Sequence, residues 1–165
     1  MGVGVTGHPK RGYSTAELIR QITITLDNPT GEDVVLVGLG NLGRALLPFF
    51  AAYHPNLRVI AAFDVDPLKT GRVIHGCRCY PLDELERIVR QHQARVAIVT
   101  VPATHAQEVT NRLVEAGIAG IMNFAPVPLK TPAEVYVESI DIAAALEKVA
   151  YLARRAHRQN EEVSA

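Results

Sequence analysis

Residues 34–43 read VVLVGLGNLG, and this stretch decides the fold. The four apolar residues 34–37 form a continuous run that is typical of a strand buried on both faces of a parallel sheet. Three glycines at the spacing Gly-x-Gly-x-x-Gly follow, and an Ala- and Leu-rich segment that predicts a helix comes after them. Strand, glycine loop and helix in this order predict a Rossmann-type unit that binds a dinucleotide.

The residues of the glycine loop have separate roles in this prediction. Gly38 permits the tight turn, Gly40 lets a pyrophosphate approach the backbone, and Gly43 lets the helix pack closely on the strand. Free N–H groups at the start of the helix hold the diphosphate. We therefore expect dinucleotide contacts along the whole loop, Gly38, Leu39, Gly40, Asn41, Leu42 and Gly43.

An acidic residue lies at the spacing that a ribose requires. Asp64 follows the loop by about twenty residues and ends the next predicted strand, residues 58–63. Its carboxylate can accept hydrogen bonds from the ribose hydroxyls, and it would repel a 2′-phosphate. The spacing therefore favours NAD(H) over NADP(H) as the cofactor.

Strands and helices alternate along the rest of the chain, which predicts an α/β fold with a doubly wound, mostly parallel sheet. Beyond the first strand, the expected elements are helix 44–53, strand 58–63, strand 77–80, helix 82–92, strand 95–101, helix 106–116 capped by Gly117, strands 118–124 and 135–138, and helix 142–158. We divide the chain into a lead-in with a linker helix (1–30), a Rossmann domain (31–140), and a C-terminal dimerisation helix with its tail (141–165).

Two further loops are expected at the carboxyl ends of strands, where ligands bind in open α/β sheets. One is Thr100, Val101 and Pro102, and the other is Asn123, Phe124, Ala125 and Pro126. We expect both on the nicotinamide side of the site. Their only titratable neighbour is His105, which we expect to start its helix, so they offer no proton donor or acceptor for hydride transfer. With little room for a substrate domain, the sequence favours a dinucleotide sensor with no catalytic residue over an enzyme.

Composition narrows the class further. The 165 residues include 17 basic and 17 acidic side chains, so we expect no general attraction for nucleic acid. Neither a membrane span nor a signal peptide is evident, which predicts a cytoplasmic protein with no membrane partner. Cys77 and Cys79 are expected to be reduced thiols, with a redox couple or half a metal site as the alternative. Because no second Cys/His pair has ligand spacing, we expect no metal.

The last helix carries a heptad pattern of its own. Its apolar residues recur at spacings of four and three, which is typical of a helix–helix seam: Ile142, Leu146, Val149, Ala153 and Ala156. This stripe could pack on the sheet of its own chain or on a partner subunit. The sequence does not decide between the two.

The combination of these motifs resembles the Rex family of redox-sensing transcriptional repressors, over nearly the whole chain. The matching stretches are residues 37–46, residues 62–67 with Lys69 and Gly71, Thr100 to Ala103 with Ala106 and Gln107, residues 116–118 and 123–126, residues 137–141, and Gly12 with Tyr13. The resemblance implies a homodimer that exchanges its last helix, in which NADH releases DNA and NAD⁺ permits repression. It also implies cofactor contacts at the three loops and at Asp64, Val65 and Lys69.

Three departures from the family pattern shape these expectations. Residues 1–11 cannot form the family's winged helix, so DNA binding would need such a domain from a longer chain or a partner. The resemblance implies that Asp141 lies at the dimer interface near the partner's nicotinamide pocket, where Ile142 replaces an aromatic residue. Phe49 replaces a tyrosine. Both changes are expected to weaken the redox switch and to leave cofactor binding intact.

Two other classes of protein share the glycine loop. One is a CoA-binding Rossmann domain, although Asp64 would face the 3′-phosphate of CoA unfavourably if the adenosine lay similarly. The other is a small NAD-dependent oxidoreductase, which the absence of catalytic groups disfavours.

Overall fold

The computed structural model describes residues 31–163. Seven strands and five helices follow one another along this part of the chain. They are β1 (Glu32–Val37), α2 (Asn41–Tyr53), β2 (Leu57–Asp64), β3 (Val73–Ile74), β4 (Cys77–Pro81), the 3₁₀ helix η1 (Leu82–Glu84), α3 (Leu85–His92), β5 (Val96–Val99), α4 (Ala103–Ala116), β6 (Gly120–Asn123), β7 (Tyr136–Ser139) and α5 (Ile142–Val163).

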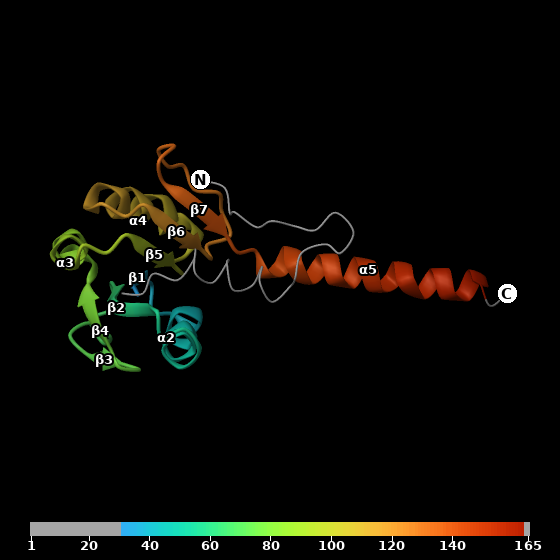
Figure 1. Cartoon of the computed structure of the whole chain (residues 1–165), viewed down its shortest axis with the longest axis horizontal. Coiled ribbons are helices and arrows are strands. Elements are labelled where there is room, and N and C mark those ends of the chain that lie inside the picture. Colours follow the sequence, from blue (N-terminus) through green and yellow to red (C-terminus); the bar gives the residue numbers. More distant parts are fainter. Residues whose placement is uncertain (1–30, 164–165) are drawn as a thin grey trace, which may run out of the picture.

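The strands form one twisted sheet in the order β3-β4-β2-β1-β5-β6-β7 (Figure 1). All neighbouring pairs are parallel except β3 and β4. The chain leaves the central strand β1 toward β2 and β4 on one side and then continues through β5, β6 and β7 on the other. This reversal places a crevice beyond the carboxyl ends of β1 and β5, so the predicted doubly wound, mostly parallel α/β fold is confirmed.

The first strand shows why the sheet has helices on both faces. Val35 and Val37 point into a core that includes residues of α3 and α4, whereas Val34 and Leu36 pack with Leu47 of α2. All four residues 34–37 are buried, as a continuous apolar run predicts. Strand β1 is therefore buried between α2 on one face and α3 with α4 on the other, and the glycine loop follows directly at its end.

Several element bounds differ from the prediction. Helix α2 begins at Asn41, three residues before the expected start, because Gly40 is extended and serves as its N-cap. Strand β5 ends at Val99, so Thr100 and Val101 lie in a loop, although β-branched residues such as these are enriched in strands. Helix α4 begins at Ala103 after Pro102, which shifts His105 from the helix start into the first turn.

The sequence pattern missed β3, a two-residue strand that pairs antiparallel with β4 and is too short to show a period. Gly117 caps α4 with a left-handed conformation, φ +109°, as predicted. The linker helix expected within residues 1–30 lies outside the described residues.

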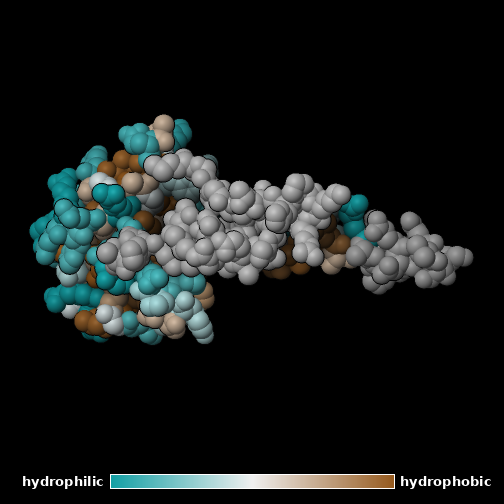
Figure 2. Space-filling model, viewed as in Figure 1, coloured by the Kyte–Doolittle hydropathy of each residue, from teal (hydrophilic) through white to brown (hydrophobic). Residues whose placement is uncertain are grey.

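Helix α5 projects away from the domain as a long single rod (Figure 1). Its apolar stripe is exposed, with Ile142, Leu146 and Val149 at 60%, 67% and 62% of their full accessible area. Figure 2 shows hydrophobic surface along the projecting helix. Of the two alternatives for this stripe, packing on the sheet of the same chain is therefore wrong. Among residues 31–163, no helix combines the length and apolar content needed to cross a bilayer.

Candidate functional site

A cleft of about 790 Å³ opens at the carboxyl ends of the central strands. Its walls come from the turn after β1, the segment after β2, the start of η1, the loop after β5, and helix α4. The residues that line it are Val37, Gly38, Gly40, Asp64, Val65, Asp66, Lys69, Leu82, Thr100, Val101, Pro102, His105, Glu108, Val109 and Arg112. The cleft lies at the reversal of strand order, where ligands bind in such sheets.

The three glycines of the loop differ in what surrounds them. Gly38 has φ +98°, and a Cβ there would lie 2.8 Å from the carbonyl oxygen of Thr100. A Cβ on Gly43 would lie 2.0 Å from the carbonyl oxygen of Gly38, so α2 crosses β1 too closely for any side chain. A Cβ on Gly40 meets no atom within 4 Å, and Gly40 faces the cleft. Two glycines therefore shape the turn, and the third leaves its backbone open to a ligand.

The first prediction concerns the stability of this turn. We expect Gly43→Ala to lower the free energy of unfolding by about 1–3 kcal/mol, because the methyl group forces α2 and β1 apart. Gly40→Ala is the matched control, and we expect it to stay within about 1 kcal/mol of the wild type, since its methyl group enters open space. Urea unfolding followed by circular dichroism measures both. Equal stability of the two variants would contradict this account of the helix–strand contact.

Thr100 holds the glycine loop from the neighbouring strand. Its hydroxyl donates to the carbonyl oxygen of Gly38 at 2.7 Å and lies 3.1 Å from that of Val37. Its backbone N–H also donates to the Val37 carbonyl oxygen at 2.9 Å. Thr100, which the sequence predicts as a ligand contact, therefore also has a structural role: it fixes the glycine turn on which a ligand would lie.

Asp64 ties the end of β2 to the same loop. Its carboxylate accepts hydrogen bonds from the backbone N–H of Leu39 at 2.7 Å, from that of Asp66 at 2.9 Å, and from the Lys69 ammonium at 3.1 Å. Burial raises the pKa of Asp64, but these donors outweigh it and hold the pKa below its ordinary value. The side chain is therefore charged at neutral pH. Its contribution to stability is present above the ordinary aspartate pKa and is lost as pH falls through the lower folded value.

The loop after β6 is shaped by one buried amide. Asn123 is fully buried, and its Nδ2 donates to the carbonyl oxygens of Ala125 at 3.2 Å and Val127 at 2.9 Å. Its Oδ1 accepts from the N–H of Ala125 at 2.9 Å. Asn123 therefore sets the course of the loop and does not line the cleft itself.

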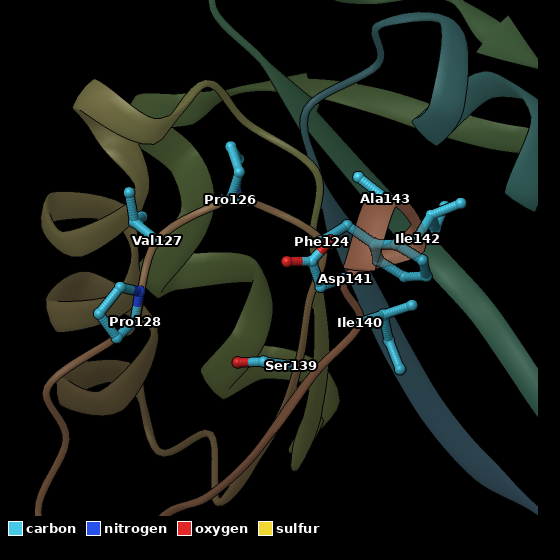
Figure 3. Close-up of a pocket in the computed structure, with 10 residues that line it drawn as sticks. Phe124, Pro126, Val127, Pro128, Ser139, Ile140, Asp141, Ile142 and Ala143 are labelled. Carbon is cyan, nitrogen blue, oxygen red and sulfur yellow. The ribbon is translucent and has the colours of Figure 1, made fainter. Parts of the chain in front are cut away.

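The rest of that loop lines a second hollow of about 440 Å³, beside the start of α5. Figure 3 shows Pro126, Val127 and Pro128 on one side of it and Asp141 with Ile142 on the other. Asp141 caps α5, because its Oδ1 accepts from the backbone N–H of Ala144 at 2.8 Å. The hollow thus joins the β6 loop to the base of the projecting helix.

The structure brings some predicted residues together and separates others. Gly38, Gly40, Asp64, Val65, Lys69 and the loop 100–102 share the cleft. Phe124, Ala125, Pro126, Asp141 and Ile142 share the second hollow. The buried Leu39 lines neither cavity, nor do Asn41, Leu42, Gly43 and Asn123.

Phe49 lies apart from both cavities, on the exposed side of α2. Its ring centroid is 5.5 Å from that of Phe50, 5.4 Å from that of Tyr53 and 5.5 Å from that of His54. It thus forms an aromatic cluster at the end of the helix. Phe49 was singled out by the resemblance to the family, and it does not line the cleft.

The sequence pattern missed the wall formed by Leu82 and by α4. Glu108, Val109 and Arg112 line the cleft with His105, which was expected only to begin its helix. The available signal was the spacing of residues 105, 108 and 112 on one helical face. That signal becomes meaningful only when the packing of α4 is known.

The two cysteines lie apart from the cleft and from the hollow beside α5. Cys77 and Cys79 are free and buried, and burial raises the pKa of each thiol to about 11. Such thiols are protonated at neutral pH and are poor nucleophiles and metal ligands. Within residues 31–163, no group of three or more His, Cys, Asp or Glu side chains is arranged to hold a metal ion.

Comparison with known proteins shows the family of the chain. Residues 30–127 match the family model of the CoA binding domain. The chain is 38% identical over 148 residues to the redox-sensing transcriptional repressor Rex of Lactobacillus acidophilus, an alignment that covers 90% of this chain and 70% of that protein.

Solved structures of a Rex-family repressor, RSP, share the fold. The complex of RSP with β-NADH has a TM-score of 0.81 at 27% identity and covers 91% of this chain and 73% of that one. The complex with β-NAD⁺ and operator DNA has a TM-score of 0.79 at 26% identity and covers 96% of this chain and 73% of that one. With this fold, this sequence match and this cleft, the chain belongs to the Rex family of redox-sensing transcriptional repressors, and its residues 30–127 are a member of the CoA binding domain family.

Proposed function

We propose that this chain is an NAD(H)-binding, redox-sensing module that regulates transcription and catalyses no reaction. The open backbone at Gly40, beside the charged carboxylate of Asp64 in one cleft, is the observation that carries the proposal. The complexes of RSP with NADH and NAD⁺ support it.

The elements of the cleft match the parts of the dinucleotide in order. The start of α2 has no side-chain cap, so its N–H groups are free to hold the pyrophosphate at Gly38 and Gly40. Asp64 and Lys69 lie where the adenosine ribose follows. The other half of the dinucleotide extends toward Thr100 and the loop 123–126. The loops 100–102 and 123–126 carry no titratable side chain that could serve as a proton donor or acceptor for hydride transfer, which supports a sensor over a dehydrogenase.

Charge supports NAD(H) over NADP(H). Two carboxylates, Asp64 and Asp66, lie beside the single ammonium of Lys69, which contacts them at 3.1 and 3.5 Å. The cluster therefore has a net negative charge where a 2′-phosphate would lie. A 2′-phosphate there would be repelled by the two carboxylates. Lys69 could not compensate, because it is already paired with both of them.

CoA is the second candidate ligand, since the matching family model is that of the CoA binding domain. The same negative cluster opposes the 3′-phosphate of CoA if its adenosine lies where that of NAD does. We therefore place CoA behind NAD(H) and treat it as a competitor in the test.

The second prediction is a titration of the whole chain with NADH, NAD⁺, NADPH and CoA. We expect saturable binding of NADH and NAD⁺, and about tenfold or more weaker binding of NADPH because of charge repulsion. Calorimetry measures all four ligands, and protein–NADH energy transfer from tyrosine adds a second readout for NADH. Tighter binding of CoA than of either form of NAD would overturn the proposal.

We further propose that the module is a homodimer held by α5, exchanged between subunits. The exposed stripe of Ile142, Leu146 and Val149 needs a partner, and α2 exposes apolar side chains of its own, including Phe49 and Tyr53. Asp141 and Ile142 would then lie at the subunit interface, next to the hollow on the nicotinamide side. The departures at Ile142 and Phe49 are expected to weaken the switch more than the binding.

We propose that the signal reaches DNA through a winged-helix domain supplied by a longer chain or by a partner. The described part of this chain is an α/β domain with a projecting helix, and the solved complex of RSP contains operator DNA. Regulation of bacterial operators would place the protein in the cytoplasm.

A further inference from the structure

A row of side chains on α4 lines the cleft. His105, Glu108 and Arg112 line the same cavity as Gly40 and Asp64. Their spacings of three and four residues place them on one face of the helix. If the glycine loop holds the pyrophosphate and Asp64 the ribose, the base attached to that ribose is the part of the ligand that reaches α4.

Arg112 is held in a fixed orientation. Its Nε donates to Oε1 of Glu86 at 2.6 Å, and its Nη2 donates to Oε2 of Glu86 and to the carbonyl oxygen of Leu82, both at 2.9 Å. Hydrogen bonding to Glu86 raises the pKa of Arg112, and the charge of Glu108 adds to this effect. Two parallel bonds fix the plane of the guanidinium. Within residues 31–163, no acceptor engages the remaining nitrogen, Nη1.

Glu108 supplies a hydrogen-bond acceptor beside the Arg112 donor. It lies one helical turn before Arg112, and its carboxylate forms no hydrogen bond or ion pair with another side chain of the described segment. A carboxylate only accepts hydrogen bonds, whereas a guanidinium only donates them. The two side chains therefore present an acceptor and a donor side by side at the wall of the cleft.

We propose that Glu108 and Arg112 select adenine as the base of the bound dinucleotide. Glu108 accepts from the exocyclic amino group, and Nη1 of Arg112 donates to the adjacent ring nitrogen. A 6-oxopurine carries a carbonyl oxygen in place of the amino group and an N–H in place of the bare ring nitrogen. Glu108 would then face a second acceptor and Arg112 a second donor, so both hydrogen bonds would be lost. This inference rests on the dinucleotide binding proposed above and adds its base specificity.

The test compares NAD⁺ with nicotinamide hypoxanthine dinucleotide, which differs only at the 6-position and the neighbouring ring nitrogen of the base. Calorimetry on the whole chain should show the hypoxanthine form binding about tenfold or more weaker, since mispaired polar groups lose their partners. In Glu108→Gln, the amide can accept from an amino group or donate to a carbonyl. We expect this variant to reduce the preference to about threefold or less.

Glu115→Gln is the matched control, on the same helix but away from the cleft, and should keep the wild-type preference. A ratio of two affinities is insensitive to a general loss of stability, so it separates base selection from a merely structural role. Equal binding of the two dinucleotides by the wild type, or an unchanged ratio in Glu108→Gln, overturns this inference alone. Binding of neither dinucleotide overturns the proposed function as well.

Discussion

Gly40→Val should abolish measurable NADH binding while the protein stays folded. A Cβ at Gly40 meets no atom of the protein within 4 Å, and the position lines the cleft, so we expect the valine side chain to be accommodated without unfolding the protein. The valine side chain lies where a pyrophosphate must approach the N–H groups at the start of α2. Loss of two charge-assisted hydrogen bonds at about 1.5–3 kcal/mol each would weaken binding by about a hundredfold or more.

The measurement is a calorimetric titration with NADH beside a thermal unfolding curve for each protein. The curve should be close to that of the wild type, because Gly40 has φ −69°, a conformation that any residue adopts. Ala119→Val, at an exposed position between α4 and β6, is a control for the added side chain and should bind NADH normally. A folded Gly40→Val protein that binds NADH with wild-type affinity would show that the pyrophosphate lies elsewhere.

Removal of residues 141–165 should convert the proposed dimer to a monomer. Helix α5 carries the exposed apolar stripe, and none of its side chains among residues 142–155 belongs to the buried core. The remaining domain should therefore keep its sheet and its cleft. Analytical ultracentrifugation of the chain ending at Ile140 gives the oligomeric state, and a truncated chain that stays dimeric would refute exchange of the helix.

Point substitutions test the same interface at full length. We expect Leu146→Glu combined with Val149→Glu to weaken the dimer by about a millionfold, because the two subunits together lose four buried aliphatic side chains at about 2 kcal/mol each. Glu147→Lys changes the charge on the opposite side of α5 and should leave the dimer intact. Equal association of the two variants would indicate that the apolar stripe is not the contact surface.

The centre of the site could be predicted because its chemistry is local in sequence. A turn that needs a positive φ at Gly38 and no side chain at Gly43 can be read from the spacing of glycines alone. Asp64 was also predictable, since the length of one helix and one strand fixes its distance from the loop. Its hydrogen bonds to Leu39 and Lys69 were not, because they depend on how two strand ends meet in space.

The outer wall could not be predicted, for a different reason. Arg112 lies at the cleft because Glu86 of α3 and the carbonyl oxygen of Leu82 hold it there. That contact joins residues 26 and 30 positions apart, and no periodic pattern encodes it. For Asn123 the sequence predicted a ligand contact that the structure does not show in the cleft. Its amide instead donates to carbonyl oxygens of its own loop.

The bond between Leu39 and Asp64 means that the glycine loop is already joined to β2 before a ligand arrives. A site built in advance loses little entropy on binding, so this end of the cleft is suited to provide affinity. The ADP half of the dinucleotide, which we place there, is identical in NADH and NAD⁺. Discrimination between them must therefore arise at the other half, toward the loop that shares a hollow with the base of α5. The concentration to which such a sensor responds and the redox ratio that it reads are thus set by different parts of one molecule, and each can evolve without the other.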